Sequence, residues 1–312
     1  MAQLIKLLDY VSRYETNPFH YPTQYIRLKQ ENWQRINDLW EIENEREAEQ
    51  ETQNLHTETT NNSFFKWNPF KAKENENVEE KFERNLPRSK KQLTQHFLNE
   101  LYPFQLKWAS STISQVSYTD QKYNSDTTLR NLLQRLPDIY LLMYYPIFNI
   151  KKAPVEGEII LISPIGIDLI SLVQTTSEST VYVGTDRTWS IESGAKKAKI
   201  LSPLIALKRS EQILKGILNR YEISFPIYKT VISETSSILY TNEPYNTSII
   251  GKDEFPMWLE EKRNLTSPLK NMQLKVIEAL LRHCQSTSVR RPEWEMDDDD
   301  YITPSTYEEK QE

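Results

Sequence analysis

The sequence predicts an α/β (or α+β) fold in which helices flank one central mixed sheet. The first observation is a stretch rich in apolar β-branched residues, EGEIILISPIGIDLISLV, at residues 156–173. Two such runs joined across Pro164-Ile165-Gly166 predict a buried β-hairpin. The second observation is two strong helix starts, Ser202-Pro203 and Ser267-Pro268, with further strand-like segments between them. This order of strands and helices is typical of a sheet with helices packed on its faces.

The turn of this hairpin is expected to centre on Ile165-Gly166. That register places Glu158 opposite Val173 and Ile160 opposite Ser171, with all four side chains on one face of the sheet. A carboxylate on such a face, with an acid and an amine across the strand pair, would suit a metal-dependent phosphodiesterase. Here the two partners are a hydroxyl and an isopropyl group, so the hairpin predicts a fold more clearly than an activity.

The N-terminal part of the chain predicts helices followed by a linker. Residues 1–45 have apolar residues at helical spacing, and this helical segment is expected to pack on the core or on a partner, although it would also suit a membrane surface. Residues 46–75 are polar and predict a disordered linker. The linker contains SFFKWNPFK at residues 63–71, which suits stacking on single-stranded bases, docking as a linear motif or anchoring against the domain. Residues 76–124 predict a helical linking region.

Residues 125–262 predict the α/β core. Ser125-Asp126 is expected to cap a helix whose leucines share one face and which ends before Pro137. A loop carrying Trp189 is expected before the helix that starts at Ser202-Pro203. Residues 263–288 predict a C-terminal helix, and residues 289–312 predict an acidic disordered tail.

Composition favours a soluble cytoplasmic protein. The single cysteine excludes an intramolecular disulfide framework, and no segment predicts a signal peptide or a membrane span. The net charge of −6 discourages nucleic-acid binding when it is taken alone. From Glu293 onward, however, nine acidic residues stand against one lysine, and the rest of the chain has 37 basic and 35 acidic residues. The overall charge therefore does not exclude a nucleic-acid ligand.

A series of short motifs follows in a specific order within residues 125–262. They are Ser125-Asp126, Leu136-Pro137, Glu156-Gly157-Glu158, Pro164-Ile165-Gly166, Ser171-Leu172-Val173, Trp189 and Ser202-Pro203. In this order the chain resembles the nuclease-related domain (NERD) family of the restriction-endonuclease-like superfamily. The resemblance implies a restriction-endonuclease-like central sheet. It also makes Asp126 and Glu158 candidate metal-site acids, with Glu156 beside them.

Two positions depart from the family pattern. Ser171 stands where the family has a glutamate, and Val173 stands where it has a lysine. Mg²⁺ is usually held by one or two carboxylates and several waters, and metal-assisted hydrolysis needs both charge stabilisation and an activated water. A hydroxyl cannot offset the charge of the cation, and a valine cannot polarise a water. The resemblance therefore implies a catalytically degenerate member, unless Lys151 or Lys152 enters the site from the preceding segment.

The leading interpretation is a bacterial-type cytoplasmic pseudoenzyme that uses no cofactor and binds DNA, RNA or a protein partner. The expected nucleic-acid ligands are the basic residues between the third strand and its helix, which would equally suit a solvated surface: Arg187, Lys196, Lys197, Lys199, Lys208 and Arg209. One alternative is an active Mg²⁺-dependent nuclease with a rearranged site. Another is an adaptor without a nucleic-acid role that binds a protein through residues 1–73.

Overall fold

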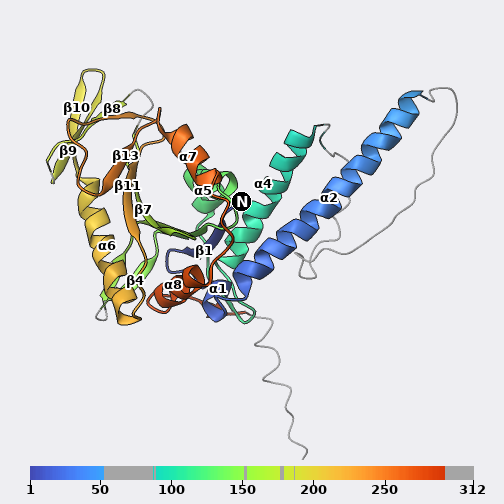
Figure 1. Ribbon diagram of the computed structural model, residues 1–312, viewed down its shortest axis with the longest axis horizontal. Coiled ribbons are helices and arrows are strands. Elements are labelled where there is room, and N and C mark those ends of the chain that lie inside the picture. The colour runs from blue at the N-terminus through green and yellow to red at the C-terminus, as the bar shows by residue number, and fades with distance from the viewer. Residues whose placement is uncertain (53–86, 88, 151–152, 176–178, 186, 292–312) are drawn as a thin grey trace, which may run out of the picture.

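The structure is a computed structural model that describes residues 1–52, 87, 89–150, 153–175, 179–185 and 187–291. Its centre is a six-stranded sheet with the strand order β1-β3-β6-β7-β11-β13 (Figure 1). The strands are β1 (Gln3–Leu7), β3 (Leu141–Tyr144), β6 (Ile159–Ser163), β7 (Gly166–Leu172), β11 (Ile227–Ile232) and β13 (Thr247–Ile250). β6 is antiparallel to its neighbours β3 and β7, whereas the other neighbouring pairs are parallel. The predicted α/β class with a central mixed sheet is confirmed.

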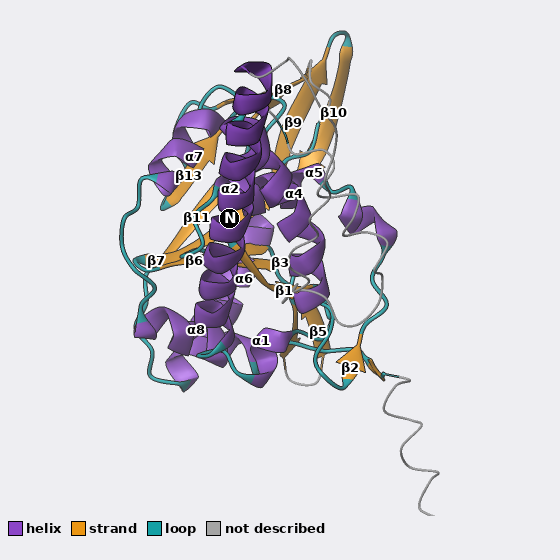
Figure 2. Cartoon of the chain, turned by 90° about the vertical axis from the view of Figure 1, so that its right-hand side faces the viewer, coloured by secondary structure: helices purple, strands orange, loops and turns teal. Residues whose placement is uncertain are grey.

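Helices cover both faces of this sheet (Figures 1 and 2). They are α1 (Arg13–Thr16), α2 (Tyr21–Thr52), α4 (Lys90–Trp108), α5 (Thr127–Arg135), α6 (Pro203–Arg220), α7 (Phe255–Arg263) and α8 (Asn271–Leu281). On one face Leu161 and Ile170 join buried side chains of α4, α5 and α7. On the other face Ile160 and Leu169 join those of α6 and α8. Both strands of the central hairpin are therefore buried on two sides, because alternate side chains of a strand point to opposite faces.

The beginning of the chain is a strand and not the predicted helix. β1 is buried at all five positions and pairs in parallel with β3. Its run of apolar residues fits a helical period, but a strand buried on both faces has the same kind of run. The helix predicted for the later part of residues 1–45 is present as α2, which continues through Thr52 into the range predicted as a linker.

The β6–β7 hairpin is present, but its turn lies one residue earlier than predicted. Ser163 pairs with Gly166, so the turn residues are Pro164-Ile165. Ser163 Oγ stabilises this turn by accepting the N–H groups of Ile165 and Gly166 at 3.3 and 3.2 Å. Gly166 belongs to the strand, where a Cβ would meet the ring of Tyr228 at 2.7 Å. The glycine therefore allows β7 to lie close to the next strand and is not needed for the turn.

This shift changes the cross-strand neighbours of the hairpin. Ile160 lies opposite Leu169, and not opposite Ser171 as predicted. Carried one residue beyond the last pair, the same register places Glu158 beside Ser171 and not beside Val173.

A second sheet, with the strand order β10-β9-β8-β12, extends from the core (Figure 1). Its strands are β8 (Ser179–Tyr182), β9 (Thr188–Ser193), β10 (Lys196–Leu201) and β12 (Ser237–Leu239). The expected loop before α6 is therefore largely a β-hairpin, and Trp189 is a buried residue of β9. The inner face of this sheet packs on the core through Val181, Trp189 and Ile238. Its other face is open to solvent.

Helices α2 and α4 extend together away from the sheet (Figures 1 and 2). The rings of Trp33 and Phe97 join them, with centroids 5.3 Å apart, and Trp40 Nε1 donates to the carbonyl of Pro87 at 2.6 Å. The helix predicted between residues 76 and 124 is α4. Nothing in the described part of the chain forms a helix that is long and apolar enough to cross a membrane.

The segment that follows α8 joins several distant parts of the chain. β14 (Val289–Arg290) pairs with β2 (Gln115–Val116), and β4 (Ile147–Ile150) pairs with β5 (Ala153–Glu156) next to it. Thr287 donates its N–H to the carbonyl of Asp9 at 2.7 Å, and its own carbonyl accepts the hydroxyl of Ser117 at 2.6 Å. The range predicted as an acidic tail therefore begins with a short paired strand, and residues 292–312 lie outside the described part.

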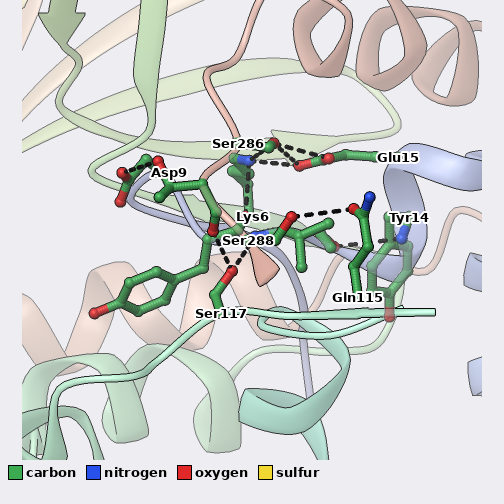
Figure 3. A network of polar contacts seen from close by, with 12 residues as sticks. Lys6, Asp9, Tyr14, Glu15, Gln115, Ser117, Ser286 and Ser288 are labelled. Atoms are coloured by element: carbon green, nitrogen blue, oxygen red, sulfur yellow. Dashed lines mark hydrogen bonds and ion pairs between the residues drawn. The ribbon is translucent and has the colours of Figure 1, made fainter. Parts of the chain in front are cut away.

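A fully buried lysine lies under this segment (Figure 3). Lys6 Nζ of β1 donates to the carbonyl of Tyr10 at 2.8 Å, to Ser286 Oγ at 2.7 Å and to the carboxylate of Glu15. Ser286 Oγ in turn lies 2.8 Å from the second carboxylate oxygen of Glu15. All three ammonium donors of Lys6 have acceptors, which explains how a charge can lie inside the core.

Candidate functional site

Asp126 lies at the N-terminus of α5, beside the end of β3. Its Oδ1 accepts the N–H of Leu129 at 2.9 Å as the helix N-cap, as predicted, and its Oδ2 accepts the hydroxyl of Tyr144 at 3.0 Å. Both carboxylate oxygens therefore have donors within the protein. A metal ion at Asp126 would have to replace at least one of them.

Glu158 lies just before β6, next to Ser171 of β7. Its backbone N–H donates to Ser210 Oγ of α6 at 3.1 Å. Burial raises the pKa of the Glu158 carboxyl, while the hydrogen bond with Ser171 and the charge of Arg209 act in the opposite direction. A hydroxyl and a guanidinium are thus its partners, in place of the second carboxylate and the amine that a metal site would use.

Tyr145 lies close enough to both predicted metal-site acids for their charges to affect it. Burial raises the pKa of its phenol, and the charges of Glu158 and Asp126 raise it further. Its ring lies against that of Tyr144, with centroids 4.8 Å apart. Asp126 belongs to the side of the sheet that α5 covers, and Glu158 to the side that α6 covers. The two acids therefore lie at the same end of the strands β3 and β6, here called the acidic edge, but on opposite faces of the sheet and without forming a pair.

Replacing Glu158 with glutamine should make stability less dependent on pH. The pKa of Glu158 is raised in the folded state, so its carboxyl favours folding below the unfolded pKa, and this contribution is lost as the pH rises through the folded value. We expect the melting temperature of Glu158→Gln, relative to wild type, to increase from pH 4 to pH 7. The gain should be small, because it comes from the titration of one carboxyl.

The measurement is thermal unfolding across that pH range. Glu156→Gln, an exposed position two residues earlier, is the matched control. A Glu158→Gln curve parallel to that of wild type would contradict the burial of this carboxyl.

The remaining predicted site residues lie apart from this edge or make structural contacts. Glu156 is exposed at the end of β5, and its carbonyl accepts Arg209 Nη2 at 3.3 Å. Val173 is buried and donates its N–H to the carbonyl of Ile232 at 2.8 Å. Asp168, on the opposite face of β7, binds Lys262 Nζ at 3.0 and 2.9 Å. Lys151 and Lys152 lie outside the described residues.

The residues at this edge do not fit a divalent metal ion. Across the described residues, no group of three or more His, Cys, Asp or Glu side chains is placed to hold one. Asp126 already has two hydrogen-bond donors, and the nearest cation to Glu158 is Arg209. A guanidinium beside the carboxylate opposes the binding of a second cation.

The six predicted basic residues do not form one patch. Lys197 and Lys199 alternate with Ala198 and Ile200 on β10, so the two lysines share the outer face of the second sheet. Lys196 shares the other side with Ala198, although it is exposed near the tip of the hairpin. Arg209 of α6 is exposed, and it donates to the carbonyl of Glu156, so it lies against the Glu156–Glu158 segment. Arg187 is exposed just before β9, and Lys208 is exposed within α6.

The outer face of the second sheet carries an aromatic residue beside lysines. The strand registers align one row across all four strands, Leu239, Tyr182, Ser190 and Lys199. Leu239 is 50% exposed and Tyr182 is 37% exposed. Lys199 makes no ion pair with another described residue, whereas Lys197 in the next row pairs with Glu192 and lies 6.0 Å from the Tyr182 ring centroid.

Sequence reasoning found the lysines of this face but not Tyr182 or Leu239. The signal for Tyr182 was its place between Val181 and Val183, because a residue between two inward-facing valines of a strand points outward. That pattern could not be used before the strand was known to lie in a sheet with one open face. The aromatic segment at residues 63–71 lies outside the described residues.

Comparison with known proteins gives one partial similarity. An RNA 2′,3′-cyclic phosphodiesterase of Geobacillus stearothermophilus is 54% identical to this chain over 43 residues, which are 14% of this chain and 14% of that protein. The chain thus matches about a seventh of the length of this relative. No protein-family profile matches the chain. No solved structure matches it either, so the comparisons show no family.

Proposed function

We propose that this chain is a catalytically inactive nuclease-related protein that binds single-stranded nucleic acid through the outer face of its second sheet. The observation that carries the proposal is the row Leu239, Tyr182, Ser190 and Lys199, which exposes an aromatic ring and a lysine on the same face of the sheet. Bases stack on such rings, and lysines neutralise phosphates.

The order of elements supports the proposed relationship to the restriction-endonuclease-like superfamily. The chain passes from the capped helix α5 through β3 and the β6–β7 hairpin to α6 and then β11. This is the order of helix, strands, Pro-x-Gly turn and Pro-led helix on which the resemblance depends. The second sheet is inserted between β7 and α6, with β12 added after β11.

The contacts at the acidic edge favour binding without cleavage. Hydrolysis of a phosphodiester through a metal ion needs a cation that offsets developing charge and activates a water. Asp126 is engaged by the helix end and by Tyr144, and Glu158 faces Ser171 and Arg209. These contacts stabilise the fold and leave no carboxylate pair for a cation.

The ligand is expected to be single-stranded, because its bases must be free to stack on Tyr182. RNA is the first ligand to test, since the partial relative is named for an activity on RNA. The Lys197–Glu192 pair leaves Lys199 as the unpaired cation of the face within the described residues. We therefore expect moderate affinity with a clear dependence on salt.

The test is a salt-titrated binding assay with single-stranded RNA, single-stranded DNA and duplex DNA, each with a parallel cleavage lane containing Mg²⁺ or Mn²⁺. Lys199→Glu should weaken binding about tenfold and lower the salt slope by about 0.7 or more, because one phosphate contact is lost. Lys275→Glu makes the same charge change at an exposed position of α8, remote from the second sheet (Figure 1), and should have little effect.

Two outcomes would contradict this proposal. Metal-dependent cleavage that Glu158→Ala abolishes would establish an active nuclease with a rearranged site. A further lane contains a substrate that ends in a 2′,3′-cyclic phosphate. Its hydrolysis would show that the chain has the activity for which the partial relative is named, and would likewise contradict a catalytically inactive protein. Equal loss of binding in Lys199→Glu and Lys275→Glu would place the nucleic acid elsewhere.

A protein-binding role for α2 is the second candidate. Leu39 and Ile42, on the part of α2 that extends from the body, are each 47% exposed. Exposed apolar residues three apart on a helix form one side of a helix interface. Under this alternative, Leu39→Ser with Ile42→Ser would abolish partner binding, and wild type would not shift RNA or DNA at low salt.

A further inference from the structure

Two arginines from opposite ends of the described chain lie close together near the start of α1. Arg13 is the first residue of α1, and Arg291 directly follows β14. The two segments run side by side, because Tyr10 forms a parallel bridge with Thr287 and the Arg291 N–H donates to the carbonyl of Ser114 at 2.9 Å. Burial lowers the pKa of Arg13, and the charge of Arg291 lowers it further, whereas Tyr21 and Tyr14 act in the opposite direction.

Neither arginine has a polar partner for its side chain within the described residues. The Nε atoms of Arg13 and Arg291 are both shielded from solvent and unpaired. The guanidinium of Arg13 lies over the Trp108 ring, 5.3 Å from the centroid, which fixes its plane but accepts no conventional hydrogen bond. Two neighbouring guanidiniums thus present donors that no described acceptor uses.

Buried lysines elsewhere in the fold differ from these two arginines, because they have carboxylate partners. Four lysines with side chains no more than 20% exposed, Lys6, Lys29, Lys229 and Lys262, each form an ion pair with a carboxylate. The two acids nearest to Arg13 in the sequence, Glu15 and Asp9, are already engaged. Glu15 binds Lys6 and Ser286, and Asp9 Oδ2 accepts the hydroxyl of Thr287 at 2.8 Å (Figure 3).

We propose that Arg13 and Arg291 together form a binding site for an oxyanion, either a phosphate group or a carboxylate. Guanidiniums are suited to this ligand because their planar forks match its oxygens in pairs of hydrogen bonds. The site does not depend on the nucleic-acid proposal, since it lies beside β2 and β14 and not on the second sheet. A bound oxyanion would also place a negative charge between two arginines that otherwise repel each other.

The oxyanion has two possible sources, which one experiment distinguishes. One source is a phosphate group in solution or on a ligand. The other is this chain itself, because Glu293, Glu295 and Asp297–Asp300 follow Arg291 within ten residues in the sequence. The second protein for the experiment is therefore a full-length chain in which Asp297–Asp300 are all replaced with asparagine and Glu293 and Glu295 with glutamine.

The experiment measures the thermal unfolding of both proteins with increasing inorganic phosphate, against chloride at equal ionic strength. At a phosphate concentration tenfold above Kd, we expect a rise in melting temperature of about 3 °C. Arg13→Gln and Arg291→Gln should each abolish this rise. Arg290→Gln, the exposed neighbouring arginine of β14, should retain it.

A response in wild type identifies phosphate as the ligand. A response that appears only in the acid-to-amide protein shows that carboxylates of the chain occupy the same arginines. In either case the arginine Nε resonances of the responding protein should shift with phosphate. The proposal is overturned if neither protein responds, or if the response survives in both Arg13→Gln and Arg291→Gln. Arg291→Gln serves as the decisive variant if Arg13→Gln does not fold, because Arg291 lies at the edge of a two-residue strand.

Discussion

Replacement of Glu15 with alanine should lower the free energy of unfolding by about 3–5 kcal/mol, because it leaves a buried charge without its counter-ion. Lys6 has no exposed side-chain surface, and Glu15 is the only carboxylate that forms an ion pair with it among the described residues. At about 2–4 °C for each kcal/mol, the melting temperature should fall by about 10 °C. Chemical denaturation with a constant m-value would measure the same loss.

The matched control is Glu278→Ala, which breaks the exposed ion pair of Glu278 with Arg282 on α8. Exposed pairs of this kind contribute less than about 1 kcal/mol. A double variant, Lys6→Met with Glu15→Ala, should recover part of the loss because it removes the buried charge together with its partner. If Glu15→Ala were no more destabilising than Glu278→Ala, the burial of a charged Lys6 would be wrong.

Tyr182→Ala should weaken binding of single-stranded RNA by about 5- to 150-fold, which corresponds to about 1–3 kcal/mol for one stacked base. The reason is that Tyr182 is the aromatic residue in the exposed row of the second sheet, in which Ser190 lies between it and Lys199. Tyr182→Phe keeps the ring and should bind nearly as tightly as wild type. The measurement is fluorescence anisotropy with a labelled oligonucleotide at constant salt.

Tyr245→Ala controls for the loss of an exposed tyrosine, because Tyr245 is 95% exposed and lies outside the second sheet. The affinity of Tyr245→Ala for single-stranded RNA, and the dependence of that affinity on salt, should match those of wild type. Tyr182→Ala should lower affinity with an unchanged salt slope, whereas Lys199→Glu should lower both. Equal effects of Tyr182→Ala and Tyr245→Ala would remove the second sheet from the interface.

The parts of the fold that local sequence determines were predicted well. Asp126 caps α5, and the apolar runs on either side of Pro164-Ile165 form the central hairpin. The register of that hairpin was missed by one residue at the turn, because the reason for Gly166 is its contact with Tyr228 more than 60 residues later. β1 was missed for a similar reason, since its partner β3 is far away in the sequence.

The candidate site was predicted as a set of residues but not as an arrangement. Glu158 and Ser171 do lie side by side, whereas Asp126 is on the other side of the sheet edge and Arg209 faces the acids. The direction of each side chain depends on strand register and on which faces of the two sheets are covered. Register and coverage depend on contacts between segments that are far apart in the sequence, and the local patterns of a single sequence do not reveal those contacts.

The contacts of Lys6 have a consequence for the order in which this chain can fold. Ser286, one of its three partners, is synthesised 280 residues after it. While the chain leaves the ribosome, β1 can pair with β3 as soon as residue 144 has emerged, yet Lys6 Nζ then has Tyr10 and Glu15 as acceptors and still lacks Ser286. We therefore expect the N-terminal strand to become fully protected from hydrogen exchange only after the segment that contains Ser286 has joined the core.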